Sequence, residues 1–154
     1  MTIYIVRHAH AGSRSEWDGP DAERPLSDKG RGQTDAITAH LAGVPVERFV
    51  SSAAVRCCQT IAPAAQERGL AVEVHPALTE GARAEETTTL IWQLAADATS
   101  AVLSSHGDVI PAAIEALRAD GVDVGDRHGL PKGTLYELDV VDGAITRATF
   151  VDPR

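Results

Sequence analysis

Short apolar runs alternate with amphipathic stretches along the chain, and the two patterns predict different elements. Apolar runs bounded by polar residues are typical of buried strands, and they fall at Thr2–Val6, Arg48–Ser51, Ala71–His75 and Ser100–Ser104. Apolar residues at helical spacing, with caps and stop signals at their ends, predict helices from the cap at Ser27 to about Ala42 and over Ala53–Arg68, Thr87–Ala96 and Val109–Leu117. Pro63 lies inside the second helix and is expected to kink or break it.

The order of these elements predicts the fold class. Strands that alternate with helices are typical of a mainly parallel sheet covered on both faces. The end of the chain differs, because Thr134–Val140 and Ile145–Val151 are separated by the turn signal Asp142–Gly143, which favours an antiparallel hairpin. A chain of 154 residues has the size of one domain. We therefore expect a single α/β domain over residues 1–154.

One long polar segment, His8–Leu26, interrupts the alternation of strands and helices. Its glycines and prolines, among them Gly12 and Pro25, predict a loop. Loops of this length in a compact domain are often functional. The segment begins directly after the first predicted strand, where it is placed to border a binding site.

Arginine and histidine side chains gather at the predicted strand ends. Arg7 and His8 follow the first strand directly, and His106 and Gly107 follow the fourth. Arg56 comes after the second strand, in the first turn of a helix. Ligands of open α/β sheets bind at the carboxyl ends of the strands, and helix N-termini attract anions. Two imidazoles and at least two guanidinium groups at this edge predict a cationic pocket suited to a phosphoryl group.

The same residues can be assigned roles in phosphoryl transfer. Such a reaction needs a neutral imidazole nitrogen as nucleophile, cations on the phosphoryl oxygens and an acid for the leaving oxygen. His8 is the candidate nucleophile, with its other ring nitrogen bound to a carbonyl that fixes the tautomer. His106 is expected to donate a further hydrogen bond. The candidates for holding the substrate are Arg7, Arg24, Arg56, His106 and Gly107.

Charge and composition exclude several other classes of function. A formal net charge of −8 argues against binding to nucleic acid or to an anionic membrane. No stretch approaches the roughly 20 apolar residues of a membrane span, and the N-terminus lacks the pattern of a signal peptide. The adjacent Cys57 and Cys58 fit two reduced thiols. We expect a cytoplasmic protein with no bound metal or cofactor, and the sequence leaves its oligomeric state open.

The motifs resemble, in their order along the chain, the histidine phosphatase superfamily, also called the phosphoglycerate mutase-like family. The matching segments are Ile5–Ala9, Arg24–Ser27 with Gly30, Ser51–Ala53 with Arg56, Gln59 and Thr60, Leu78–Gly81, and Ser105–Gly107. The short chain, the Arg-Pro-Leu-Ser segment and the alanine after His8 are most similar to the small SixA-type phosphohistidine phosphatases. The resemblance implies a three-layer α/β/α sandwich, a phosphohistidine intermediate on His8 and no cofactor.

The resemblance also implies site residues. It implies a phosphate pocket of Arg7, Arg56 and His106, to which the SixA-like branch adds Arg24. Two carboxylates are candidates for the proton donor, and both stay open at this point. Glu80, in Leu-Thr-Glu-Gly, matches the position of the donor in mutases and many phosphatases of the family. Asp21, in the loop after the nucleophile, matches the SixA-like alternative and is the other candidate for a place in the pocket.

The function that these observations favour is that of a metal-independent phosphatase. It would hydrolyse phosphohistidine in a protein, or phosphomonoesters, through a phosphohistidine intermediate on His8. The segment after the Glu80 loop is short, which predicts an open and shallow site. The alternatives are a phosphatase for small sugar or nucleotide phosphates and a phosphate-binding regulatory module without turnover. No catalytic role is assigned to Arg127–His128, and Lys132–Gly133 is interpreted as the start of a strand.

Overall fold

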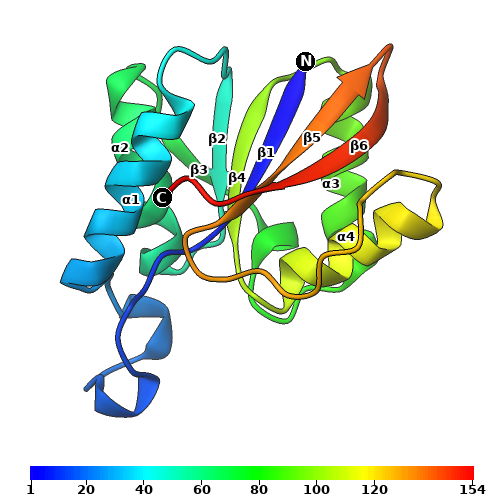
Figure 1. Cartoon of the computed structure of the whole chain (residues 1–154). Helices are drawn as coiled ribbons and strands as arrows, with labels where there is room; N and C mark the ends of the chain where they lie inside the picture. Colours follow the sequence, from blue (N-terminus) through cyan, green and yellow to red (C-terminus); the bar gives the residue numbers. More distant parts are fainter.

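A computed structural model describes all residues from Met1 to Arg154 and places a six-stranded sheet at the centre of the molecule (Figure 1). The strand order is β3-β2-β4-β1-β5-β6. The four strands β1 to β4 pair in parallel and β5 pairs antiparallel with β6, as the sequence predicts, and β5 also pairs antiparallel with β1. The strands are β1 Thr2–Arg7, β2 Arg48–Ser51, β3 Val72–Val74, β4 Ala101–Ser105, β5 Leu135–Val141 and β6 Ala144–Val151.

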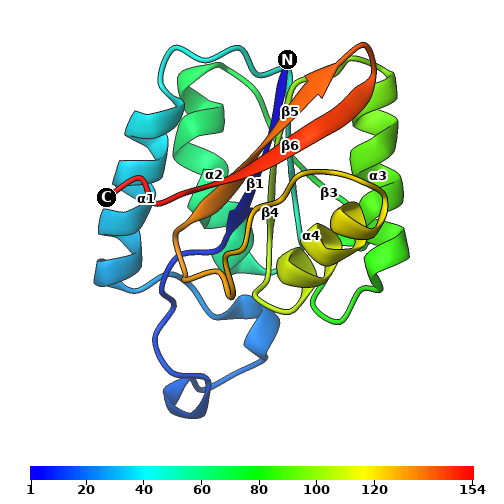
Figure 2. The same ribbon diagram turned by 45° about the vertical axis from the view of Figure 1, so that its right-hand side comes forward.

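Four helices cover the two faces of this sheet, so the predicted α/β/α sandwich is confirmed (Figures 1 and 2). They are α1 Asp28–Leu41, α2 Val55–Glu67, α3 Ala84–Ala96 and α4 Val109–Ala119. None of them combines the length and apolar composition that a membrane span requires. The pair α1 and α2 packs on one face and the pair α3 and α4 on the other.

The central strand β1 shows why the sheet needs helices on both sides. Its side chains point alternately to the two faces, and both sets are buried. Ile3 and Ile5 belong to the larger apolar core under α3 and α4. Tyr4 and Val6 belong to the smaller core under α1 and α2. The strand is therefore held on both faces, which fixes the position of the residues that follow it.

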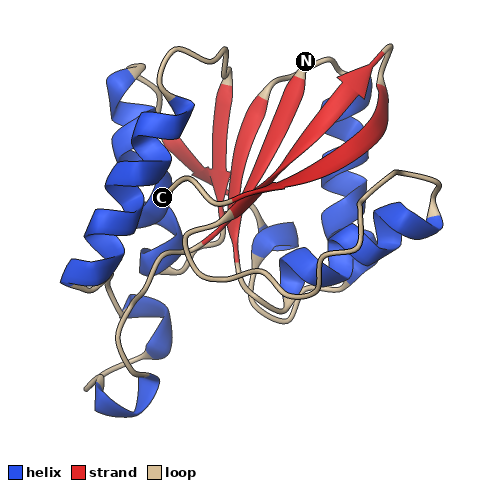
Figure 3. Cartoon of the chain, in the orientation of Figure 1, coloured by secondary structure: helices blue, strands red, loops and turns tan.

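The boundaries differ from the predictions in a few places. Of the kink or break expected at Pro63, the break does not occur, because helix α2 is continuous from Val55 to Glu67. Proline removes one hydrogen bond from the helix, and both Pro63 and Gln59, whose carbonyl loses its partner, lie on the partly exposed side of α2. The loop His8–Leu26 (blue in Figure 1, tan and blue in Figure 3) contains two single turns of 3₁₀ helix, at Arg14–Glu16 and Asp21–Glu23.

A close backbone contact attaches the start of α1 to the segment after β1. The Ser27 side chain caps α1 by accepting a hydrogen bond from the Gly30 amide at 3.1 Å, and the Ser27 amide donates to the His10 carbonyl at 3.0 Å. A Cβ at Gly30 would lie only 1.9 Å from that carbonyl oxygen. Glycine is thus required at this position because any side chain would push α1 away from the backbone that follows His8.

This contact predicts opposite effects for two glycines of α1. Gly30→Ala forces helix and loop apart and should lower the free energy of unfolding by about 1–3 kcal/mol or more. Gly32→Ala has no atom within 4 Å of the new Cβ, and it should stabilise the exposed helix by up to about 1 kcal/mol. Urea unfolding followed by circular dichroism measures both values. Equal shifts in the two variants would contradict the close contact at Gly30.

Candidate active site

The carboxyl ends of β1 and β4 bring two histidines together. The strands are neighbours in register, with Arg7 opposite Ser105. The His8 amide then donates to the Ser105 carbonyl at 3.0 Å, so His8 and His106 leave their strands at the same level. Their rings lie edge to face, with centroids 5.5 Å apart and planes inclined by 68°. Two residues that are 98 positions apart in the chain therefore share one site.

A hollow of about 310 Å³ opens at this sheet edge and has no apolar residue in its lining. It contains every residue predicted for the site except Asp21. Three further residues, Arg14, Asp108 and Lys132, were not predicted. The full lining consists of Arg7, His8, Arg14, Arg24, Arg56, Glu80, His106, Gly107, Asp108 and Lys132.

Two larger hollows lie elsewhere and have different chemistry. One, of about 440 Å³, lies between α4 and the loop before β5, and the other, of about 450 Å³, lies between α1 and α2. Neither combines a strand-end histidine with converging arginines. The largest hollow is the usual first candidate for a binding site. Here the smaller hollow at the ends of β1 and β4 is the better candidate, because it is the one that combines two histidines with converging arginines.

His8 is held in a single tautomer. Its Nδ1 lies 2.8 Å from the backbone oxygen of Ala9, which can only accept a hydrogen bond. Nδ1 therefore carries the proton, and the lone pair of the neutral ring is on Nε2. The Ala9 amide is fixed in turn by the Thr60 hydroxyl oxygen at 3.0 Å, and Thr60 donates to the Arg56 carbonyl in α2 at 2.7 Å. This chain of bonds ties the orientation of the His8 ring to helix α2.

Burial and positive charge keep both histidines neutral. Burial is the main cause that lowers the pKa of His8 to about 3, and the charges of Arg56 and Arg7 act in the same direction. Burial also lowers the pKa of His106, helped by Arg56 and opposed by the negative charge of Glu80. At neutral pH the His8 ring consequently offers a lone pair rather than a positive charge.

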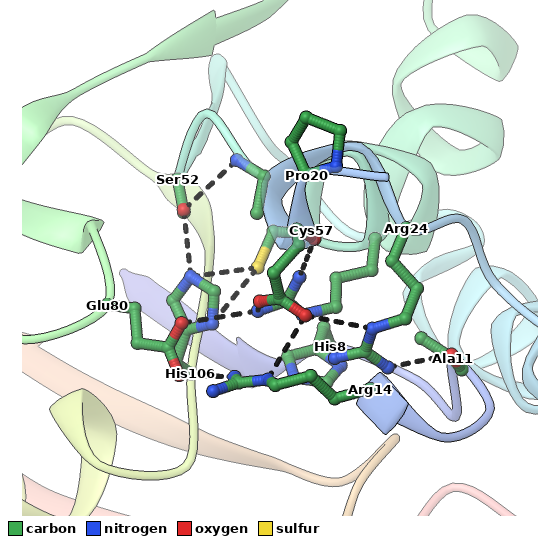
Figure 4. A network of polar contacts seen from close by, with 12 residues as sticks. His8, Ala11, Arg14, Pro20, Arg24, Ser52, Cys57, Glu80 and His106 are labelled. Atoms are coloured by element: carbon green, nitrogen blue, oxygen red, sulfur yellow. Dashed lines mark hydrogen bonds and ion pairs between the residues drawn. The ribbon is translucent and has the colours of Figure 1, made fainter. Parts of the chain in front are cut away.

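His106 is supported from the side of β2 and α2. Its Nε2 lies 2.9 Å from the Ser52 hydroxyl and 3.5 Å from the Cys57 sulfur (Figure 4). Burial raises the pKa of the Cys57 thiol to about 12. Cys57 therefore contacts His106 as an uncharged thiol, while Ser52 supplies the hydrogen bond that orients the ring.

Arg7 is placed by the loop before β5 and by the absence of a side chain at Gly107. Its Nη1 donates to the Leu130 carbonyl at 2.7 Å, and its Nε is buried with no partner in the protein. A Cβ at Gly107 would come within 2.5 Å of the guanidinium carbon. Burial lowers the pKa of Arg7, although the charge of Asp108 opposes this effect.

Arg56 and Arg24 share a carboxylate, that of Asp21. Arg56 is the largest fully buried side chain and would be costly to bury unpaired. It contacts the Asp21 carboxylate at 3.1 Å and the Asp21 carbonyl at 2.9 Å. Arg24 contacts the same carboxylate at 3.1 Å and donates to the Ala11 carbonyl at 2.7 Å. Asp21 therefore positions the arginines and is not itself among the residues that line the hollow.

The Asp21 carboxylate is held in its ionised form. Burial works against ionisation, but the hydrogen bond from Arg24 and the charges of Arg56, Arg24 and Arg14 outweigh it, so the pKa of Asp21 lies below its ordinary value. Glu80 is more exposed and lines the hollow itself. Its two oxygens contact Arg14 at 3.0 Å and Arg56 at 3.4 Å (Figure 4).

The residues that sequence analysis missed come from positions without a distinctive pattern. Arg14 lies in the long loop, and Asp108 follows the recognised His106–Gly107 pair. Lys132 precedes β5, and its place in the site depends on backbone bonds from Gly133 to the Arg7 and His8 carbonyls, both 3.3 Å long. No cluster of three or more His, Cys, Asp or Glu side chains is arranged to hold a metal ion.

The fold and the site are those of an α/β protein with two strand-end histidines and converging arginines. Residues 3–89 match the family model of the histidine phosphatase superfamily, branch 1. The chain belongs to this superfamily, and the resemblance seen in the sequence is confirmed.

Individual proteins show the same likeness. An 8-oxo-(d)GTP phosphatase of Mycolicibacterium smegmatis is 33% identical over 99% of this chain, which spans only 48% of that longer protein. The structure of SixA from Agrobacterium tumefaciens has a TM-score of 0.67 at 26% identity, covering 90% of each chain. A protein histidine phosphatase SixA complexed with tungstate has a TM-score of 0.72 at 21% identity, covering 99% of this chain and 97% of its own, and supports the fold.

The environment of His8 predicts an unusual titration. In the folded protein its ring should stay in the neutral Nδ1–H form between about pH 8 and pH 5, whereas in urea it should titrate near its ordinary pKa of about 6.5. Because the unfolded chain takes up this proton first, burial of His8 makes the protein less stable as the pH falls from about 6.5 towards 3. Ring ¹⁵N chemical shifts measure the tautomer and the charge. A folded-state titration of His8 near pH 6.5 would contradict this environment.

Proposed function

We propose that this protein is a phosphatase that works by two successive phosphoryl transfers, first to His8 and then to water. The observation that supports this most directly is the state of His8: a neutral ring, fixed by the Ala9 carbonyl, with its Nε2 lone pair free in a hollow lined by arginines. In the first step Nε2 attacks phosphorus, and the bond from phosphorus to the leaving atom breaks, which is an oxygen in a phosphomonoester and a ring nitrogen in phosphohistidine. In the second step water attacks the phosphohistidine, and the P–N bond returns its electron pair to Nε2.

The arginines supply the electrostatic stabilisation of both steps. Arg7 and Arg56 each have a buried Nε without a partner in the protein. Unpaired buried donors are unfavourable, and an oxyanion in the hollow provides the acceptors that these side chains lack. Guanidinium groups fixed in advance stabilise the charge that spreads over the equatorial oxygens in the transition state. His106, held by Ser52, adds a neutral hydrogen-bond partner.

Glu80 is the proton donor in this proposal, and Asp21 is a positioning residue. Glu80 lines the hollow and is partly exposed, so it can exchange protons with solvent. A bound phosphoryl dianion competes for Arg56 and favours a protonated carboxyl group beside it. After Glu80 has given its proton to the leaving oxygen, the resulting carboxylate can accept a proton from the attacking water. Asp21 is bound to three arginines and stays ionised, which does not suit a donor.

The substrate is phosphohistidine in a protein or a small phosphomonoester. The likeness to SixA favours the first. The 33% identity to an 8-oxo-(d)GTP phosphatase favours a nucleotide phosphate as the second candidate. Both candidates use the same chemistry at His8, so they differ only in the group that leaves.

The nucleophile is tested with p-nitrophenyl phosphate in EDTA. We expect turnover in the wild type, acid-labile phosphoprotein after acid quenching, and a loss of at least about a thousandfold in His8→Ala. His75→Ala, which removes a histidine outside the hollow, is the matched control. Tight binding of phosphate or vanadate without turnover on any phosphomonoester would instead identify a regulatory module.

The proton donor is tested by comparing leaving groups. Glu80→Gln should lose about 10²–10⁴-fold with an alkyl phosphate and little with p-nitrophenyl phosphate, whose leaving group hardly needs a proton. Asp21→Asn should weaken both substrates alike, mainly through KM, because it loosens Arg24 and Arg56. The measurement is kcat and KM for each pair. The reverse pattern would make Asp21 the donor.

A further inference from the structure

Two of the five cations that line the hollow have no carboxylate partner. Arg14, Arg24 and Arg56 each contact the carboxylate of Asp21 at 3.1 Å. Arg7 and Lys132 form no ion pair, and Arg7 is bound to the Leu130 carbonyl instead. Lys132 is the one cation of the set for which neither an ion pair nor a hydrogen bond of the side chain is found.

The backbone of Lys132 is nevertheless fixed against the nucleophile strand. Two residues before it, the Leu130 carbonyl accepts from Arg7 at 2.7 Å. Directly after it, the Gly133 amide bonds to the carbonyls of Arg7 and His8. The loop thus places an unpaired ammonium group at the wall of the hollow, among like charges. Partial burial and the charges of Arg7, Arg24, Arg56 and Lys29 lower the pKa of Lys132.

The volume of the hollow leaves space beside the transferred group. Even if each of its five heavy atoms took the ~30 Å³ of a whole water molecule, a phosphoryl group with its leaving oxygen would fill about 150 Å³, roughly half of the 310 Å³. The lining has no hydrophobic residue and carries five cations against the two carboxylates of Glu80 and Asp108, which favours negative charge in the space next to the phosphoryl group. It suits a second charged group, and Lys132 is the free cation that such a group can meet.

We propose that Lys132 is a specificity-determining residue that binds a second anionic group, a phosphate or a carboxylate, close to the scissile phosphoryl group. This inference rests on the proposed function for the position of that phosphoryl group. It changes the interpretation of Lys132, which in the sequence suggests only the start of a strand. A lysine fits this role because its ammonium group is a compact point charge on a flexible stem and can follow anions of different shape.

Three phosphonates that are not hydrolysed test the proposal as inhibitors of p-nitrophenyl phosphate turnover in EDTA. Methylphosphonate has no second anion, phosphonoacetate adds a carboxylate, and methylenediphosphonate adds a phosphonate. The measured quantity is the ratio of the inhibition constant of methylphosphonate to that of each bifunctional compound. In the wild type we expect at least one ratio of about tenfold or more, the effect of one charge-assisted hydrogen bond. The compound with the larger ratio identifies the preferred anion.

The variants separate a direct contact from the general positive field. Lys132→Ala should reduce the larger of the two ratios to less than about threefold, even if the inhibition constant of methylphosphonate also changes. Lys132→Arg should keep most of that ratio, because it keeps the positive charge. Lys29→Ala is the matched control, because Lys29 adds to the same field but is exposed and does not line the hollow. Lys29→Ala should leave the ratio unchanged.

Two outcomes would overturn the proposal. One is a wild-type ratio near one for both bifunctional compounds. The other is a ratio that is the same in Lys132→Ala as in the wild type, even if all three compounds bind more weakly. If p-nitrophenyl phosphate is not turned over at all, the proposed function fails. The role of Lys132 can then still be tested, because calorimetric titration of the three phosphonates gives the corresponding ratios of dissociation constants without catalysis.

Discussion

The repulsion between five cations that share one small hollow is the constraint on which the rest of the site depends. Like charges at this density would separate unless other groups held them. Asp21 binds three of the arginines at once, and backbone carbonyls accept from Arg24 and Arg7. Burial is the main cause that lowers the pKa of His8 and of His106, and the positive field that remains acts in the same direction. One set of contacts therefore both assembles the anion site and prepares the nucleophile.

The sheet holds the site residues in place against this repulsion because β1 and β4 lie in its middle. Both strands are buried on two faces, and their register places His8 and His106 at one level. Helix α2 carries Arg56 in its first turn and also fixes Ala9 through Thr60. Two of the five cations, Arg7 and Arg56, are thus attached to the central strand β1 and to helix α2, whereas Arg14, Arg24 and Lys132 come from the loops around the hollow.

The sequence predicts the features that depend on local pattern and misses those that depend on tertiary placement. The strand ends at Arg7 and Ser105 follow from apolar runs, so the position of the two histidines was predictable. The sequence left open whether Pro63 kinks or breaks its helix, and the structure shows a helix that continues past it. Lys132 and Arg14 come from loops, where only backbone contacts such as those of Gly133 determine which way the chain turns. The contact of Asp21 with three arginines has no sequence signal at all.

The contact between Arg7 and Gly107 has an evolutionary consequence. The guanidinium group occupies the space in which any side chain at position 107 would begin. A single substitution at 107 therefore displaces Arg7, while a smaller residue at 7 removes the cation and leaves a void. Substitutions at the two positions should therefore be coupled, because they compete for the same space. Homologues that carry a larger residue after the second histidine should accordingly have changed the residue before the first one as well.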